Sequence, residues 1–456
     1  MVKLQGFAPD LDPTTPGILQ SVTNMLPTTR GMIGAPTPVD TSWVVFAKTY
    51  GGAVIDTLTG GERTFLSSGA SVYELMPDGS EVFRGSGQST ELYQYNSREM
   101  FTSFGNAVIK ANGIAIMALT TGNFAYLTAP AAKIVESVGL FVLAFNTRTG
   151  GGVTADGWAA CALGDYTNWT PSAATQAANG RLLDSAGEIT AARRINDGII
   201  AYKKRSMYYG QYVGGDIIWQ WSQVTTNIGC VGKDAVVNAG GVHYFVGADD
   251  IYMFDGSYPR SIGANIKRWF FADADPARIQ NIVAVHDRND DHVWFWYSSK
   301  TAASGFFDTA IVYNMLTGAW GRVSQVCQDV MTYQGGTNTL QIINPTGSGT
   351  VHKVQSLTGA TDTASMQTWA MGDDDQYSRL SKVRLRFIDN PTSATVTHYH
   401  KSSLGDSYTT GTTDTMSDNK VNFGQSARWH KLKIDTVGDF EISGLNITES
   451  VQNGNK

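Results

Sequence analysis

The stretch VHYFVGADDIYMFDGSYPRSIG, residues 242–263, contains two aromatic runs separated by Gly-Ala-Asp-Asp, and the second run is followed by Asp-Gly. Short runs of β-forming residues bounded by Gly and Asp predict a hairpin of two strands. Asp249 and Asp250 are therefore interpreted as turn residues whose carboxylates bond nearby backbone N–H groups, and so is Asp255 before Gly256. A calcium loop needs a different order, D-x-D-x-D-G with a later Glu, which this stretch lacks.

Similar units recur along the chain. SVGLFVLAFNTR begins at Ser137, NDGIIAYKKRSMYY at Asn196, AGGVHYFVGADDIYMF at Ala239 and RNDDHVWFWYSS at Arg288. A buried strand, a polar break and a second aromatic strand every ~40–50 residues are typical of propeller blades, which stack radially because none can bury both faces alone. The sequence predicts an all-β chain with a β-propeller of six or seven degenerate blades over residues 41–345.

The two flanks of the propeller differ from it in composition. Proline fixes φ and cannot donate to a strand ladder, so residues 1–40 are predicted to be an extended arm without regular strands, with one helical turn around Gly17–Met25. Residues 346–456 alternate polar and apolar positions, as in VHKVQ (351–355) and TVTHYH (395–400), which predicts a C-terminal antiparallel β-sandwich with a frayed tail. The arm contains six prolines: Pro9, Pro13, Pro16, Pro27, Pro36 and Pro38.

Composition narrows the class of protein. The 456 residues are 42% hydrophobic and 16% charged, with a formal net charge of −6, which indicates a globular chain and argues against nucleic-acid wrapping as its main task. Cys161, Cys230 and Cys327 are far apart, which predicts free thiols, buried or half-buried, in a reducing cytosol. The first residues lack the pattern of a signal peptide, and no apolar run approaches the ~18 residues of a membrane span.

Few side chains in the sequence are candidates for catalysis or metal binding. His398 and His400 share one face of a predicted strand and could bind a metal, although an exposed strand face is the preferred interpretation. Acidic pairs such as Asp273 and Asp275, and the run 373–375, are interpreted as turns or solvated loops. No nucleophile elbow, zincin or P-loop motif occurs, so we expect no enzyme, no cofactor and no metal, although paired carboxylates of a glycosidase remain an alternative for a propeller. The tryptophans are interpreted as blade packing: Trp158, Trp169, Trp219, Trp221, Trp294, Trp296 and Trp320.

The order of several motifs resembles a known family. LGDYTNWTP (163–171), IGCVG (228–232), DRNDDHVWFWY (287–297) and DTAIVYNMLTGAWGRV (308–323) follow one another as in the packaged-DNA stabilization, or tail hub (nozzle), proteins of short-tailed bacteriophages. NMLPTTRGMIGAPTP (24–38) is similar to the family's opening, so the resemblance extends over nearly the whole chain.

The resemblance implies a structural protein of the virion tail, assembled in the host cytoplasm. It would form a ring, a homo-hexamer, below the portal and adaptor proteins of the head-to-tail connector, extend the DNA channel and help to retain packaged DNA until ejection. Tail fibre, spike or plug proteins would be further partners, DNA would pass without specific binding, and no membrane would be involved. The alternative is a glycan-binding or glycan-cleaving propeller used in host attachment.

Overall fold

The hairpin predicted within residues 242–263 forms β24 (Val242–Val246) and β25 (Ile251–Phe254), which pair antiparallel from His243 opposite Phe254 to Val246 opposite Ile251. β23 (Val236–Ala239) and β26 (Arg260–Ser261) complete a four-stranded sheet. The computed structural model describes residues 1–451 apart from 46, 60, 87–97, 150–151, 304, 335–338 and 347–350.

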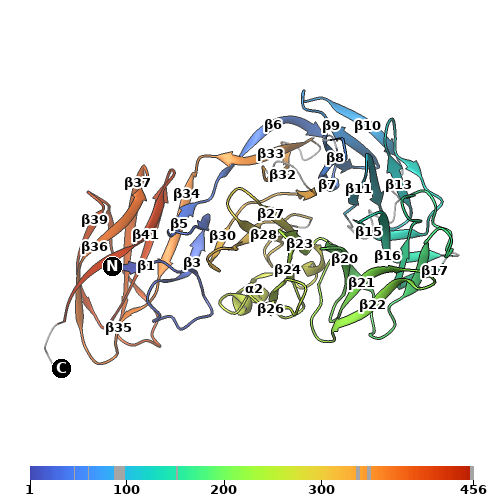
Figure 1. Cartoon of the computed structure of the whole chain (residues 1–456). Coiled ribbons are helices and arrows are strands. Elements are labelled where there is room, and N and C mark those ends of the chain that lie inside the picture. The colour runs from blue at the N-terminus through green and yellow to red at the C-terminus, as the bar shows by residue number, and fades with distance from the viewer. Residues whose placement is uncertain are drawn as a thin grey trace.

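This sheet is one blade of a β-propeller (Figure 1). Four separate four-stranded sheets, two halves of an eight-stranded sheet and four strands of a ten-stranded sheet make seven blades within the described ranges. Contacts between neighbouring innermost strands run from β7 through β11, β15, β19, β23 and β27 to β31, and β31 pairs with β7 again. The all-β propeller predicted from the recurring hairpins is confirmed, and the count is seven.

The blades are numbered in chain order. Blade 1 contains β7 (Thr49–Asp56), β8 (Glu62–Ser68), β9 (Ser71–Leu75) and β10 (Glu81–Ser86). Blade 2 contains β11 (Met100–Phe104), β12 (Ala107–Ala111), β13 (Ile116–Leu119) and β14 (Ala125–Tyr126). Blade 3 contains β15 (Ala131–Val138), β16 (Phe141–Thr149), β17 (Gly152–Ala160) and β18 (Ala178–Arg181). Blade 4 contains β19 (Ile189–Ile195), β20 (Gly198–Lys203), β21 (Met207–Gly214) and β22 (Ile218–Thr225). Blade 5 contains β23–β26, and blade 6 contains β27 (Val283–Asp287), β28 (His292–Tyr297), β29 (Thr309–Asn314) and β30 (Trp320–Val323).

Blade 7 closes the ring with strands from two distant parts of the chain. It combines β31 (Asp329–Gln334), β32 (Gln341–Thr346) and β33 (Val351–Gly359) with β6 (Thr37–Val45), which pairs antiparallel with β33. Figure 1 shows β6 in blue beside β33 in orange. The alternation in 351–355 had suggested a sandwich strand, but pairing with β32 and β6 places it in the propeller, because an outer blade strand also has one wet face.

The N-terminal segment is not the strand-free arm that its prolines suggested. It forms β1 (Val2–Lys3), β2 (Gly6–Phe7), β3 (Ile18–Thr23), β4 (Met25–Pro27) and β5 (Met32–Gly34) before β6. The predicted helical turn around Gly17–Met25 is wrong, because Ile18, Leu19 and Val22 are buried in a strand that pairs with β34. Proline is tolerated at strand ends and on edge strands, and Pro38 lies on β6, the edge strand of blade 7.

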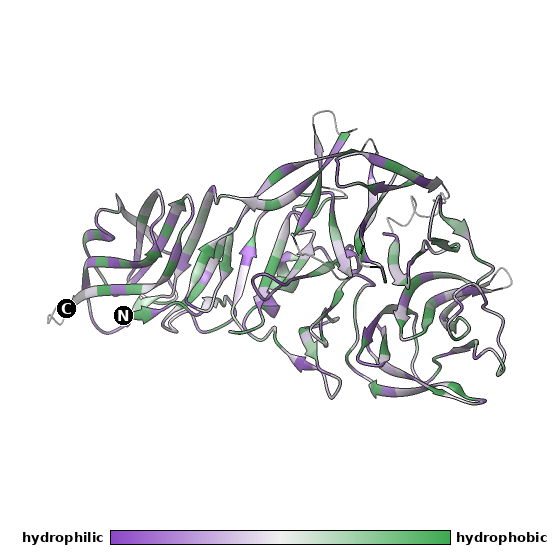
Figure 2. Cartoon of the chain, turned by 45° about the horizontal axis from the view of Figure 1, so that its top comes forward, coloured by the Kyte–Doolittle hydropathy of each residue, from purple (hydrophilic) through white to green (hydrophobic). Residues whose placement is uncertain are grey.

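The C-terminal unit consists of two facing sheets that include the N-terminal strands. One sheet contains β3, β34 (Thr363–Thr368), β40 (Trp429–Val437), β37 (Ser393–Lys401) and β38 (Thr409–Thr415), with β35 (Met371–Gly372) against β40. The other contains β5, β41 (Glu441–Val451), β36 (Ser378–Asp389) and β39 (Lys420–Ala427), with β1 against β41. Hydrophilic and hydrophobic residues alternate along these strands (Figure 2), as expected for sheets with one buried face.

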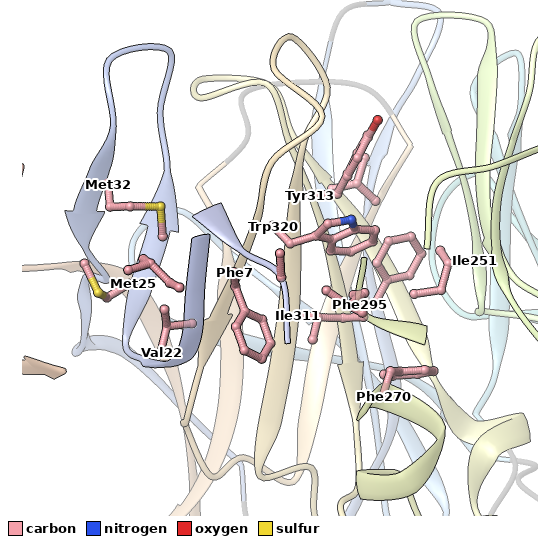
Figure 3. Packing of buried hydrophobic residues seen from close by; sticks show 14 of the residues in the cluster. Phe7, Val22, Met25, Met32, Ile251, Phe270, Phe295, Ile311, Tyr313 and Trp320 are labelled. Atoms are coloured by element: carbon pink, nitrogen blue, oxygen red, sulfur yellow. The ribbon is translucent and has the colours of Figure 1, made fainter. Parts of the chain in front are cut away.

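Propeller and sandwich share a hydrogen-bonded sheet and a core. The ten-stranded sheet continues from β30 of blade 6 through the β4–β5 hairpin to β41, with Arg322 opposite Met25 and Glu441 opposite Ile33. One buried cluster contains residues of both units, and Phe7 of β2 lies within it between Val22 and Ile311 (Figure 3).

The short helix α2 (Lys267–Asp273) ties the N-terminal segment to the propeller. The Asp10 carboxylate accepts hydrogen bonds from the backbone N–H groups of Arg268 at 2.6 Å and Trp269 at 3.0 Å, so a distant residue satisfies the first turn of the helix. A 3-10 turn, Ile279–Asn281, follows before β27.

Candidate functional site

A cavity of about 490 Å³ lies on the propeller axis. It lies at the end where the innermost strands begin, which we call the cavity face, and Tyr50, Ile189 and Asp329 at the starts of β7, β19 and β31 line it. Turns between the second and third strands of a blade reach the same face, as residues 112–114 do. A cavity of this size can hold one small molecule.

The cavity is basic although the whole chain is acidic. Its charged lining consists of Lys48, Arg98, Lys133, Arg148, Lys233 and Arg278 against Glu188, Asp234 and Asp329. Burial and the neighbouring Arg98 guanidinium lower the pKa of Lys233 to about 8, although Asp234 opposes the shift. Its ammonium group donates a hydrogen bond to the Arg98 carbonyl oxygen, so Lys233 is held at the floor of the cavity.

A chain of ion pairs crosses the propeller axis beneath the cavity. Arg98 in the segment before β11 lies 2.6 Å from a carboxylate oxygen of Asp329 in blade 7 and 3.6 Å from one of Asp234 before β23. Arg193 of β19 lies 3.6 Å from Asp234 and 3.8 Å from Glu136 of β15. These side chains are largely buried and join residues of blades 2, 3, 4, 5 and 7, so ion pairs link five blades across the propeller axis.

A second buried ion pair lies in blade 2 and is hydrogen-bonded to blade 1. The Lys110 ammonium of β12 lies 2.9 Å and 3.2 Å from the two oxygens of the Glu99 carboxylate. Their side chains are 1% and 0% exposed, and the Ser67 hydroxyl of β8 donates to the same carboxylate. A buried charge is costly unless it is paired in this way.

The acidic residues of the opening stretch bond backbone and neighbouring side chains. The Asp250 carboxylate, 4% exposed, accepts hydrogen bonds from the Ile251 backbone N–H, the Ser261 hydroxyl and the Lys267 ammonium, each at 2.8 Å. Asp249 accepts from the Tyr252 hydroxyl at 3.1 Å. The turn role of Asp250 was predictable from its neighbours in sequence, whereas its ion pair with α2 was not, because Lys267 reaches Asp250 only in the folded chain.

Within the histidine pair of the sandwich, His398 is buried and His400 is half-buried, so this strand face is not exposed as expected. His398 of β37 is 0% exposed and stacks on both His400 and His430, which lies on the neighbouring strand β40. His398 Nε2 lies 2.8 Å from His430 Nδ1, so the two rings share a proton instead of facing a common ligand. Burial, with the nearby His430 and His400, lowers the pKa of His398 to about 4.

A cluster that sequence analysis did not single out lies at the turn between β27 and β28. Ligand atoms of Asp287, Asp290 and His292 lie within 4.8 Å of one another, the only such group of His, Cys, Asp or Glu in the described part of the chain. Asp287 and His292 are directly opposite in the hairpin, and burial raises the pKa of Asp287. The run DRNDDH resembled a polar turn, and no local signal showed that these side chains converge.

The three cysteines are free and buried, as predicted. Burial raises the pKa of Cys161 to about 11 and that of Cys230 to about 12, so both are protonated thiols at neutral pH. No helix among the described residues is long and apolar enough to cross a membrane.

No protein-family model and no curated protein matches the chain. Among solved structures it is similar to virginiamycin B lyase from Staphylococcus aureus, with 8% identity over 70% of this chain and 98% of that chain and a TM-score of 0.45. It is also similar to the WD40 domain of Neurospora crassa Pan2, with 6% identity over 71% of this chain and 96% of that chain and a TM-score of 0.42. The likeness is one of fold alone.

Proposed function

We propose that the chain is a structural subunit of the tail of a short-tailed phage. It would form a ring of six below the portal and adaptor, extend the DNA channel and help to retain the packaged genome until ejection. The motif order quoted above suggested this role, and the observation that carries it is the hydrogen-bonded sheet joining blade 6 to the sandwich through β4 and β5. Domains joined by one sheet and one core do not rotate freely against each other. This rigidity suits a tail subunit that must resist the pressure of packaged DNA.

The DNA path in this proposal runs between subunits. Ion pairs link five blades across the propeller axis, and the cavity above them has room only for a small molecule. Retention would then depend on the lumen of the ring or on a plug, not on phosphate contacts within one subunit. Strong, steeply salt-dependent binding of duplex DNA by the assembled ring would contradict this arrangement.

The cavity carboxylates do not favour the glycan-cleaving alternative. A glycosidase needs two carboxylates that act on the substrate, one as acid and one as base or nucleophile. Asp234 and Asp329 both lie against Arg98, and Asp329 also accepts hydrogen bonds from the backbone N–H groups of Gly51 at 2.7 Å and Val330 at 2.8 Å. These bonds account for Asp234 and Asp329 as parts of the scaffold. The third lining carboxylate, Glu188, accepts a hydrogen bond from the Asn146 side-chain amide at 2.9 Å and lies 3.4 Å from the Lys133 ammonium.

Exposed apolar hairpin tips supply contact points for neighbouring subunits. On the face opposite the cavity, turns after the first or third strand of a blade present large apolar side chains that are all at least 59% exposed. They are Leu58, Leu140, Ile217, Tyr258 and Leu316. Apolar tips gathered on one face favour protein contacts there, and the occupant that fits the proposal is another copy of the chain or the adaptor ring.

The test is the mass and symmetry of the particle, alone and mixed with a portal–adaptor assembly from a short-tailed phage. Native mass spectrometry and negative-stain microscopy should show a six-fold ring seated on the adaptor. A chain that neither self-associates nor joins the assembly would refute the proposal.

A matched pair of variants locates the contact. Leu58→Asp, at a tip 80% exposed, should reduce ring assembly, whereas Leu183→Asp, 65% exposed in the connection from β18 to β19 on the cavity face, should not. Both are surface changes with small expected effects on folding. Equal loss in the two variants would show that the tips are not the contact.

A further inference from the structure

The cluster at the β27–β28 turn borders a second cavity, of about 270 Å³, at the joint between propeller and sandwich. Asp287 and Asp290 line it from blade 6, Leu26 and Ile33 from the β4–β5 hairpin, and Asp439 from the segment before β41. The cavity therefore combines carboxylates with room for water at the place where the two units meet.

His292 is prepared to act as a ligand. Its ring is 1% exposed, and its Nε2 lies 2.6 Å from the Pro27 carbonyl oxygen, which can only accept a hydrogen bond. Nε2 must therefore carry the proton, which leaves a lone pair on Nδ1 in the neutral ring. Nδ1 has no hydrogen-bond partner among the described residues. Histidine ligands commonly donate their other N–H to a backbone carbonyl in this way.

We propose that Asp287, Asp290 and His292 bind one divalent transition-metal ion, Zn²⁺ or Mn²⁺. Imidazole with two carboxylates suits these ions better than Ca²⁺ or Mg²⁺, which prefer oxygen ligands alone. Metal–ligand distances of about 2.0–2.2 Å require ligand atoms no more than about 4 Å apart, so the ion draws the group slightly together. Asp290 is exposed and free to make that movement, and water from the cavity completes the coordination.

The ion would strengthen the joint between propeller and sandwich. A metal on Nδ1 withdraws electron density from the ring, so Nε2–H becomes a stronger donor to Pro27. Pro27 ends β4, the strand through which blade 6 continues into the sandwich, and the Asn314 side-chain amide donates to the same carbonyl at 3.3 Å. The bound ion would thus stabilise the contact between blade 6 and β4. This inference does not depend on the proposed role in a phage tail.

The test uses the full chain after removal of metals with EDTA. Titration calorimetry and thermal unfolding are measured with ZnCl₂, MnCl₂ and CaCl₂, and Co²⁺ is used as an optical probe of nitrogen ligation. We expect one equivalent of Zn²⁺ or Mn²⁺ to bind and to raise the Tm, with Ca²⁺ at least tenfold weaker. No binding of either transition metal, or equally tight Ca²⁺ binding, would overturn the proposal.

Three variants assign the ligands. Asp290→Asn should weaken Zn²⁺ binding at least tenfold and His292→Gln should remove it together with the Co²⁺ absorption of a nitrogen ligand. Asp291→Asn is the matched control, because it makes the same change in the same turn at φ +53, a conformation that Asn adopts readily. Since Asp290 is exposed, its variant remains folded even if His292→Gln does not. Unchanged affinity in Asp290→Asn, or the same loss in Asp291→Asn, would refute the site.

Discussion

Replacing Lys110 by methionine removes the ammonium group that is paired with the buried Glu99 carboxylate, while keeping most of the side-chain volume. Glu99 retains the Ser67 hydroxyl as a hydrogen-bond donor but loses contacts of 2.9 Å and 3.2 Å with the ammonium group. The Lys110 ammonium also lies 5.3 Å from the centre of the Phe124 ring, an interaction that the variant loses.

Breaking a fully buried pair on one side costs about 3–5 kcal/mol, because the remaining charge is uncompensated. With an m value of about 4 kcal/mol/M in guanidinium chloride, a cost of about 4 kcal/mol lowers the unfolding midpoint by about 1 M. The midpoint is measured by far-UV circular dichroism and by tryptophan fluorescence, which together report strands and blade cores.

The double variant Lys110→Met with Glu99→Gln provides the decisive comparison. Gln keeps a hydrogen-bonding group for Ser67 but carries no charge, so the double variant should regain at least half of the loss. A Lys110→Met midpoint within 0.2 M of the parent, a shift of about 0.8 kcal/mol at that m value, would refute the reasoning. Additive losses in the double variant would also refute it, because the cost would then not come from an unpaired charge.

Three further outcomes follow from the structure. Burial lowers the pKa of His243 to about 4, whereas a histidine of the unfolded chain has a pKa near 6.5, so the unfolded chain binds the proton first as the pH falls. The contribution of His243 to stability should therefore fall by about 3 kcal/mol between pH 6.5 and 4, and urea midpoints of His243→Gln should fall less steeply than those of the parent. Trp320→Ala, at a side chain 1% exposed beside Tyr313 (Figure 3), should cost about 3–5 kcal/mol in thermal unfolding, and a cost below 1 kcal/mol would contradict its place in the core. Gly321→Ala places Cβ 2.3 Å from the Met25 carbonyl oxygen, so it should separate β30 from β4 and make the joint between propeller and sandwich sensitive to limited proteolysis. Gly424→Ala in β39 is the control, because the nearest atom to its Cβ is 3.6 Å away, and it should leave the proteolysis pattern unchanged.

The strands of the blades were predictable because their signals are local. Aromatic and β-branched runs framed by Gly and Asp specify hairpins wherever they occur, and blades 3 to 6 follow one another without interruption. The blade count was not predictable, because blade 7 takes β6 from residues 37–45 and β33 from 351–359. The prolines of the N-terminal segment lie in turns, at strand ends or on the edge strand β6, so they do not exclude the short strands β3, β4 and β5, each of which pairs on both sides.

The candidate sites were less predictable than the fold. The turn role of Asp250 was predictable from the adjacent residues, whereas its ion pair with Lys267 was not. Metal-site motifs are recognised by the spacing of ligands along the chain. The proposed site depends instead on which nitrogen of His292 has a free lone pair, and this is set by a hydrogen bond to Pro27, 265 residues away in sequence. The burial of His398 depends equally on β40, a strand that local periodicity cannot pair with β37.

The pairing of β6 with β33 also bears on how the protein is made. At about 5–20 residues per second, the about 300 residues between these strands take roughly 15–60 s to emerge from the ribosome. Throughout that interval β6 has no partner of its own, so its hydrogen-bonding groups are open to strands of other nascent chains on the same messenger. Yield should therefore depend on chaperones and on translation speed, and a circular permutant that begins at β7 and ends with β6 should mature faster than the natural order.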